Sequence, residues 1–198
     1  MLTKEQLQPF CSTDETRLSL QTPYVRDGCT YATDGRVAVR VPGEVPGCHV
    51  DVNAPDTGKV IDQIPDSGSW IPVTMPEDIT ASVPCEDCRG DPDHECAACD
   101  GTGEVTAKFY WRGTTYDIDG TCPLCDGSGV CARCGGTGWH SNDDPVKLGS
   151  NVYSANRLAK VAALPGVMLC DVEGYQPVRF RFDDDGEGAI MPMRMEAI

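Results

Sequence analysis

Four pairs of cysteines constrain the fold of this chain more than any other feature. They lie between residues 85 and 138, and two residues separate the cysteines of each pair. Three pairs continue into a segment with two glycines, whereas the first pair has Pro92 where the second glycine would stand. The stretch is therefore an internal repeat of the form C-x-x-C-x-G-x-G. Two cysteines at this spacing can turn both sulfurs toward one metal ion, and two such pairs supply the four thiolates of a closed tetrahedral zinc site.

Eight cysteines in this pattern predict two Zn²⁺ ions as cofactors. The glycines fit this interpretation, because the backbone just past the second cysteine needs a positive φ that glycine adopts without a Cβ clash. Disulfides, a redox dithiol and an iron–sulfur cluster are the alternatives. Disulfides require an oxidising compartment, a redox C-x-x-C usually accompanies a βαβ pattern, and four thiolates can also hold an iron–sulfur cluster.

The pairing of the four motifs follows from the segments between them. Residues 104–111 and 114–118 alternate like two strands around the turn at Arg112 and Gly113, and a hairpin there folds the second motif onto the third and the first onto the fourth. We therefore predict two nested sites: Cys85, Cys88, Cys131 and Cys134 (site 1), and Cys96, Cys99, Cys122 and Cys125 (site 2). His94 is a weaker candidate ligand, since eight thiolates already fill two sites.

Four repeats in this arrangement resemble the cysteine-rich zinc domain of DnaJ-type chaperones, and the nested pairing of that family agrees with the one predicted here. The resemblance covers about a quarter of the chain and departs from the family at Pro92. No His-Pro-Asp tripeptide is present, so stimulation of a partner chaperone's ATPase is not implied. The resemblance implies a zinc module with a role in protein contacts, for which the hairpin residues Phe109, Tyr110 and Trp111 are candidates.

The composition limits the kinds of partner and the cellular compartment that we expect for this chain. The chain has 198 residues, room for one or two domains, with 16 basic and 31 acidic residues and a net charge of −15. Two four-thiolate zinc sites would bring the charge to about −19, which disfavours a broad DNA-binding surface. We expect no signal peptide and no membrane span. The other cysteines, predicted to be buried apolar residues of a protein in the reducing cytoplasm, are Cys11, Cys29, Cys48 and Cys170.

Outside the cysteine-rich stretch, the pattern predicts three helices and a set of strands. Residues 3–10 form a short helix capped by Thr3, and residues 154–163 form a helix that begins at Ser154 and ends before Pro165. Asp34 and Gly35 suggest a two-residue hairpin turn. The remaining elements are strands at 17–20, 29–33, 36–41, 70–73, 167–171, 177–182 and 189–194, and a short helix at 57–64.

Two of these segments resemble bacterial sliding clamps, the processivity rings of replicative DNA polymerases. Residues 32–39, Ala-Thr-Asp-Gly-Arg-Val-Ala-Val, are similar to a clamp hairpin with one histidine missing, and residues 189–194, Ala-Ile-Met-Pro-Met-Arg, are similar to the clamp C-terminus. The resemblance implies an α+β fold, a single clamp-like domain of two helix-plus-strands halves, interrupted by a β-hairpin-rich two-zinc module. The expected boundaries are 1–84 and 140–198 for the clamp-like domain and 85–139 for the insertion.

The clamp resemblance also implies roles for individual residues. Lys4, Arg157 and Lys160 correspond to helix positions that would face DNA, although solvated helix faces are the more common interpretation of such residues. Pro192, Met193 and Arg194 correspond to a partner-binding groove, and the alternative is an edge strand that proline protects from further pairing. A clamp subunit has three such domains and two subunits close the ring, so a ring of this chain would be a homo-oligomer of about six copies.

The sequence therefore predicts a non-enzymatic, zinc-binding interaction protein with protein partners, and with DNA as a disfavoured second partner. A phage or mobile-element DNA replication accessory factor would suit its small size and mosaic build. The alternatives are a chaperone-like or purely structural zinc protein, and a thiol–disulfide enzyme that uses one C-x-x-C. No catalytic residues stand out, since the chain has only three histidines: His49, His94 and His140.

Overall fold

The computed structural model describes residues 2–183 and 185–194, and the chain divides into two compact units. The first, which we call the sheet unit, consists of Met1–Ala81 and Asp143–Ile198. The second, the cysteine-rich unit, is Ser82–Asn142. At each end, this unit extends three residues beyond the insertion expected at 85–139.

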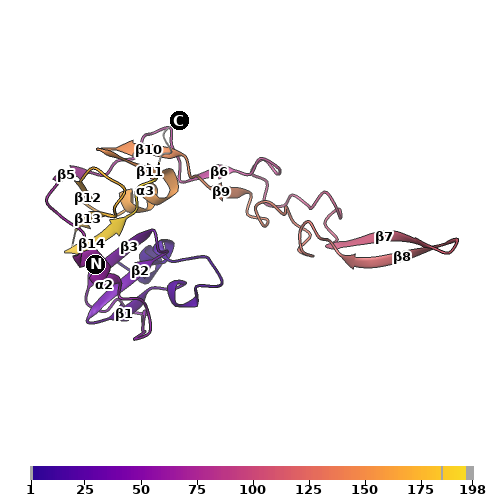
Figure 1. The fold of residues 1–198 in the computed structure, drawn as a ribbon, viewed down its shortest axis with the longest axis horizontal. Coiled ribbons are helices and arrows are strands. Elements are labelled where there is room, and N and C mark those ends of the chain that lie inside the picture. Colours follow the sequence, from indigo (N-terminus) through magenta and orange to yellow (C-terminus); the bar gives the residue numbers. More distant parts are fainter. Residues whose placement is uncertain (1, 184, 195–198) are drawn as a thin grey trace. The chain divides into compact units, whose positions relative to one another are not determined.

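An eight-stranded sheet forms the centre of the sheet unit, in the order β4-β1-β2-β3-β14-β13-β12-β5 (Figure 1). β3 and β14 pair antiparallel in the middle of the sheet, with Val37 opposite Ile190, so the segments before and after the cysteine-rich unit form one sheet. The strands are β1 Tyr24–Arg26, β2 Cys29–Thr33, β3 Val37–Pro42, β4 His49–Val50, β5 Ser69–Pro72, β12 Met168–Asp171, β13 Val178–Phe182 and β14 Gly186–Ile190.

The main core lies on one face of this sheet. Alternate residues of β3 and β13 point to this face, as the period of two in a strand requires. The core also includes residues of α1 (Lys4–Leu7), the 3₁₀ helix η1 (Gln8–Phe10) and α3 (Ala155–Ala162). Its principal side chains are Leu7, Phe10, Val37, Val39, Val41, Leu158, Val161, Val178, Phe180 and Phe182.

Two glycines of β14 allow the aromatic rings of β13 to pack closely. A Cβ on Gly188 would lie 2.3 Å from the ring of Phe180 and 2.2 Å from the carbonyl oxygen of Ala38. A Cβ on Gly186 would lie 2.1 Å from the ring of Phe182. Larger residues at these positions would push the rings out of the core, because protein interiors are packed at crystal-like density.

The opposite face of the sheet carries a smaller apolar cluster and a charge network. Ile61 of α2 (Thr57–Asp62) and Ile64 just after it pack against this face. Glu187 of β14 accepts hydrogen bonds from Arg40 of β3 and Arg179 of β13. Burial acts to raise the pKa of Glu187, but these two guanidinium groups hold it below its usual value.

The predicted N-terminal helix is present, and Thr3 caps it in a capping box with Gln6. α3 begins where predicted, but the Ser154 hydroxyl donates to Asp143 rather than accepting from the helix. Before α3, β10 (Pro145–Leu148) and β11 (Asn151–Ser154) form a hairpin that the sequence did not indicate. Of the four isolated cysteines, Cys11 and Cys170 are buried as predicted, whereas Cys29 and Cys48 are only partly buried.

Three predicted strand features are wrong. Residues 18–20 form a 3₁₀ helix, η2 (Leu18–Leu20), because the alternation there does not reflect burial: Leu18 is 75% exposed. The β2–β3 turn is shifted by one residue from the predicted Asp34 and Gly35: Thr33 pairs with Ala38, and the Asp34 N–H donates to the Val37 carbonyl, so the turn residues are Gly35 and Arg36. The final strand ends at Ile190, and Met191 and Met193 instead donate backbone hydrogen bonds to Arg36 and Val152.

The cysteine-rich unit contains two separate antiparallel pairs of strands. At its base, β6 (Ser82–Pro84) pairs with β9 (Trp139–Ser141), so Pro84 lies opposite Trp139. The long hairpin consists of β7 (Glu104–Trp111) and β8 (Thr114–Thr121) (Figure 1). Within residues 2–183 and 185–194, no helix has the length and apolar character needed to cross a membrane.

Candidate metal centres and binding groove

The second, third and fourth cysteine motifs fold into the same tight knuckle. In the second motif, Asp100, Gly101 and Gly103 have φ values of 47°, 77° and 76°, all in the left-handed region. The equivalent positions of the third and fourth motifs also have positive φ. The second glycine then turns its N–H back to the second cysteine, as in the 3.3 Å hydrogen bond from Gly103 to Sγ of Cys99. A glycine at these positions avoids the clash that a Cβ would cause.

The second glycine of a motif is also required for contact with the partner motif. A Cβ on Gly103 would lie 2.3 Å from the carbonyl oxygen of Gly127, and a Cβ on Gly129 would lie 2.3 Å from that of Gly101. The second and third motifs therefore pack reciprocally through their glycines. This close backbone approach explains why the repeat specifies two glycines rather than one.

Backbone hydrogen bonds reinforce the same pairing. In site 2, Cys96 donates to the carbonyl of Gly129 and Cys122 donates to that of Gly103, both at 2.8 Å. In site 1, Cys85 donates to the carbonyl of Gly138 at 2.8 Å. Pro92 stands where the reciprocal glycine would be, and its carbonyl does not accept the corresponding bond from Cys131. Cys131 donates instead to the carbonyl of His94, at 3.0 Å.

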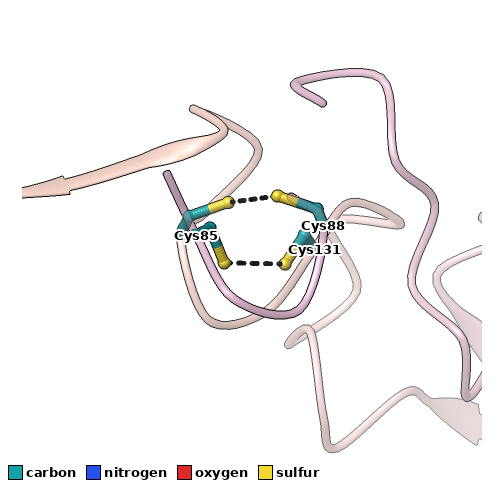
Figure 2. A group of neighbouring side chains, drawn as sticks. Cys85, Cys88 and Cys131 are labelled. Atoms are coloured by element: carbon teal, nitrogen blue, oxygen red, sulfur yellow. Dashed lines mark hydrogen bonds between the residues drawn. The ribbon is translucent and has the colours of Figure 1, made fainter. Parts of the chain in front are cut away.

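The eight sulfurs form two groups of four, and within each group all ligand atoms lie within 4.8 Å of one another. The three labelled cysteines of site 1 point toward one another in Figure 2. The Sγ–Sγ distances between paired motifs are 3.9 and 3.6 Å in site 1 and 3.9 and 3.8 Å in site 2. The groups are Cys85, Cys88, Cys131 and Cys134, and Cys96, Cys99, Cys122 and Cys125.

These distances fit zinc and do not fit disulfides. Tetrahedral thiolates with Zn–S bonds of about 2.3 Å have their sulfurs about 3.8 Å apart, whereas bonded sulfurs are about 2.05 Å apart. The prediction of two four-cysteine groups that suit two Zn²⁺ ions is therefore confirmed. The His94 side chain is not a member of either group. Bound zinc would cross-link the motifs, and four protein ligands would leave it no open position for catalysis.

The electrostatics of the thiols point to the same conclusion. Burial acts to raise the pKa of Cys125, but the N–H of Gly129 and the neighbouring thiols lower it to about 6. In the same site, the N–H of Ala98 acts to lower the pKa of Cys96, but burial and the neighbouring thiols raise it to about 11. One sulfur thus ionises readily and hinders the ionisation of another. A bound divalent cation removes this conflict by stabilising all four thiolates.

The aromatic residues of the β7–β8 hairpin lie on two faces rather than one. Phe109 and Trp111 share a face, with their ring centroids 6.5 Å apart, whereas Tyr110 is on the other. Tyr116 pairs with Phe109 and Ile118 pairs with Ala107, so both belong to the Phe109 face. The resulting surface, which we call the hairpin face, is about half exposed at its large side chains: Phe109, Trp111, Tyr116 and Ile118.

The sheet unit has a groove where residues 32–39 meet residues 189–194. The backbone N–H of Met191 donates to the carbonyl of Arg36 at 2.9 Å, and this contact joins residues 32–39 to residues 189–194. On one side lies a pocket of about 260 Å³, which we call the apolar pocket. Its lining includes Leu20, Val37, Val60, Pro177, Ile190 and Met191, of which only Met191 is close to the predicted partner-binding residues.

A second pocket, of about 500 Å³, lies on the other side of the same contact. Pro192, Met193 and Arg194 all line it, so the structure brings these predicted residues to one surface. Gly35, Arg36 and Met191 line both pockets, so the two pockets adjoin each other. Val60 and Pro177 could not be identified from the sequence, because no motif includes them and only the tertiary fold brings them to the groove.

The three predicted DNA-facing residues lie on the helical side of the sheet. Lys4 begins α1 and Lys160 lies near the end of α3, and both are partly buried. The side chain of Arg157 is 16% exposed, lines the second pocket and lies 4.0 Å from Asp143. Arg157 therefore lines a pocket that neither lysine lines. Contact of any of the three residues with DNA stays a prediction.

Comparison with known proteins found no matching family model. Over 71 residues the chain is 35% identical to the chaperone protein DnaJ of Paramagnetospirillum magneticum, covering 30% of this chain and 18% of that one. The chain thus spans less than a fifth of that relative.

Sliding clamps are among the solved structures to which the chain is similar. For the DnaN sliding clamp of Bartonella birtlesii, bound to griselimycin, the identity is 14%, the TM-score 0.43, and the match covers 96% of this chain and 64% of that one. For the Helicobacter pylori β clamp bound to a DNA ligase peptide, the identity is 10% and the TM-score 0.40, and the match covers 96% of this chain and 62% of that one. The chain spans less than two thirds of each clamp. Both families that the sequence motifs resemble are therefore among the proteins found.

Proposed function

We propose that this chain is a non-enzymatic interaction protein that binds an extended segment of a partner protein in the groove of the sheet unit. The observation that carries the proposal is the meeting of residues 32–39 and 189–194, where Met191 is hydrogen-bonded to Arg36 beside the apolar pocket. These are the two segments whose sequences resemble sliding clamps. Concave, mostly apolar sites with a few polar groups are the usual form of a binding pocket.

The cysteine-rich unit has a supporting role in this proposal. Two four-thiolate zinc sites would fix its fold, and the β6–β9 pairing holds Pro84 and Trp139 opposite each other. The sheet unit can then be interrupted between Ala81 and Asp143 without losing the pairing of β3 with β14. We place the protein in a replication-linked setting in the cytoplasm, as a factor of phage or mobile-element origin. A ring would require a homo-oligomer, which sizing by light scattering would detect.

The test uses a library of random peptides displayed on phage and selected against the full zinc-loaded chain. Val60 lines the apolar pocket and is 52% exposed, so V60E should place a charge in the pocket without disturbing the core. V52E is the matched control, because Val52 is 76% exposed and does not line the pocket. We expect selected peptides to lose binding to V60E and to retain it with V52E. Peptides that bind V60E as well as the unchanged chain would refute the proposal.

A second function is favoured by the hairpin face: chaperone-like binding of unfolded proteins by the cysteine-rich unit. Apolar side chains exposed together mark interaction surfaces more often than isolated ones do. The double variant F109S/W111S removes the two stacked rings, whereas Y110S changes the opposite face and serves as the control. Suppression of the aggregation of a denatured client should be lost in F109S/W111S and kept in Y110S. Equal activity of all three proteins would exclude this function for the hairpin face.

A further inference from the structure

We infer that the second pocket of the groove recognises an acidic side chain of the bound segment, an inference that rests on the proposed peptide-binding function. Three arginines line this pocket from three different elements: Arg36 from the β2–β3 connection, Arg157 from α3, and Arg194 from the C-terminal segment. Asp143 is the one acidic residue of the lining. Three positive charges and one negative charge give the lining a net charge of +2, in a chain whose total is −15.

The single carboxylate does not neutralise the arginines. Asp143 accepts a hydrogen bond of 2.5 Å from the Ser154 hydroxyl and lies 4.0 Å from a guanidinium nitrogen of Arg157, at the limit of an ion pair. Within the residues that the structure describes, neither Arg36 nor Arg194 forms an ion pair. Their charges are therefore available to an anion, and guanidinium groups match carboxylates with paired, charge-assisted hydrogen bonds.

The backbone holds this pocket in place. Met191 donates to Arg36 at 2.9 Å and Met193 donates to Val152 at 2.7 Å, so the segment that carries Arg194 is fixed to the β2–β3 connection and to β11. Pro192, between the two methionines, is buried. A pocket supported in this way can orient its charged groups before the partner arrives, which lowers the ordering cost of binding.

The position of the pocket favours a peptide over DNA as the source of the anion. It adjoins the apolar pocket, with which it shares the lining residues Gly35, Arg36 and Met191, and an apolar pocket suits a side chain rather than a phosphate backbone. DNA binding depends on a track of cations, yet Lys4 and Lys160 do not line either pocket.

The experiment starts from the peptides selected by the unchanged chain. One selected peptide and its analogue, with each Asp or Glu changed to Asn or Gln, are labelled and titrated by fluorescence anisotropy. The protein variants are R36Q/R194Q, which changes two exposed residues, and R157Q, with folding checked by circular dichroism. K147Q is the control, because Lys147 is exposed and lines neither pocket.

We expect R36Q/R194Q to weaken binding of the acidic peptide about 10-fold to 100-fold, as charge-assisted hydrogen bonds are lost. The amide analogue should bind weakly to the unchanged chain and should not distinguish it from R36Q/R194Q. K147Q should bind both peptides like the unchanged chain.

Two results would overturn the inference. Selected peptides that lose binding to V60E but carry no acidic residue would leave the proposed function standing and refute the acidic recognition. Duplex or single-stranded oligonucleotides that displace the peptide and depend on the same arginines would show that the pocket serves nucleic acid. If no selected peptide loses binding to V60E, the proposed function itself fails, a result distinct from both.

Discussion

The two units of this chain bury different kinds of side chain. The sheet unit buries a continuous set of aliphatic and aromatic side chains contributed by β3, β13, β14 and α3. In the cysteine-rich unit, every buried apolar side chain is a cysteine. The first unit can therefore fold by removing apolar surface from water. The second has no such core, and its stability has to come from what the cysteines bind.

This comparison also shows how a loop-rich insertion can interrupt a sheet. Both four-cysteine groups lie within residues 82–142, so the cysteine-rich unit contains all the ligands of its own two sites. Its termini pair through β6 and β9. The sheet unit, in turn, completes its sheet through β3 and β14, from opposite sides of the interruption. We therefore expect metal removal or a substitution in one unit to leave the other unit folded.

The largest expected effect is that of metal removal. Structural zinc contributes on the order of 10 kcal/mol to the folding of small metal-bound domains, so a strong chelator with a reducing agent should unfold the cysteine-rich unit. Amide hydrogen exchange should then be rapid throughout residues 82–142 and remain slow in β3, β13 and β14. Loss of protection in both units at the same chelator concentration would contradict their independence.

The next effect compares two buried cysteines, one in each unit. Serine is a poor zinc ligand, so C122S should leave the chain with one zinc ion instead of two and disorder site 2. C170S removes an equally buried sulfur from the sheet unit and should keep both ions, at a cost of about 1–3 kcal/mol in the free energy of unfolding. Native mass spectrometry and urea denaturation measure the two outcomes. Equal zinc content in both variants would show that site 2 is not built from Cys122.

A smaller effect distinguishes glycines within the cysteine-rich unit. G103A combines a positive φ with a Cβ placed 2.3 Å from the Gly127 carbonyl oxygen, whereas G120A adds a Cβ with no heavy atom within 4 Å. The left-handed backbone alone costs a residue with a Cβ about 1–2 kcal/mol. Transfer of zinc from site 2 to a chromophoric chelator should therefore be about tenfold faster or more in G103A. Equal rates in G103A and G120A would contradict the reciprocal glycine packing.

The smallest effect concerns Glu187 in the sheet unit. Burial acts to raise its pKa, but the hydrogen bonds from Arg179 and Arg40 hold the pKa in the folded chain below the ordinary value of 4.5. Its contribution to stability is therefore complete above about pH 4.5 and is lost as the pH falls through the lower, folded-state pKa. E187Q should lower the free energy of unfolding by about 1–2 kcal/mol at pH 7, and by less near pH 3.

Urea denaturation of the metal-free protein at both pH values isolates this effect, because acid also protonates the zinc ligands. D62N is the matched control, because Asp62 also accepts a hydrogen bond from Arg40 but is mostly exposed. D62N should show a smaller change than E187Q, since exposed ion pairs contribute little to stability. An equal pH dependence in the unchanged chain and E187Q would show that Glu187 does not contribute in this way.

The sequence predicted the cysteine groups well because their determinants are local. The C-x-x-C spacing sets the ligand geometry, and the alternation in residues 104–118 identifies the hairpin that brings Cys99 to Cys125. The prediction that groups Tyr110 with Phe109 and Trp111 ignores this alternation, which places Tyr110 on the opposite face. Tyr116 and Ile118 belong to the hairpin face because of the register in which β7 pairs with β8. The sequence of one strand alone does not determine that register.

Features that depend on distant contacts were harder to predict. Leu18 and Leu20 alternate like strand residues but lack a neighbouring strand, so they form η2. The groove combines Val60 and Pro177 with the motif residues only through the packing of α2 and the start of β13. The sequence assigned Arg157 to DNA and Arg194 to a partner protein and gave Arg36 no role, and only the fold reveals that all three line one pocket.

The metal content of the reduced 21.3 kDa chain, measured by native mass spectrometry, tests most directly whether zinc holds the cysteine-rich unit together. We expect two zinc ions per chain, with the eight cysteines of sites 1 and 2 protected from alkylation until the metal is removed. One zinc ion or none, in protein whose cysteine-rich unit is nevertheless folded, would contradict the claim that zinc replaces an apolar core there.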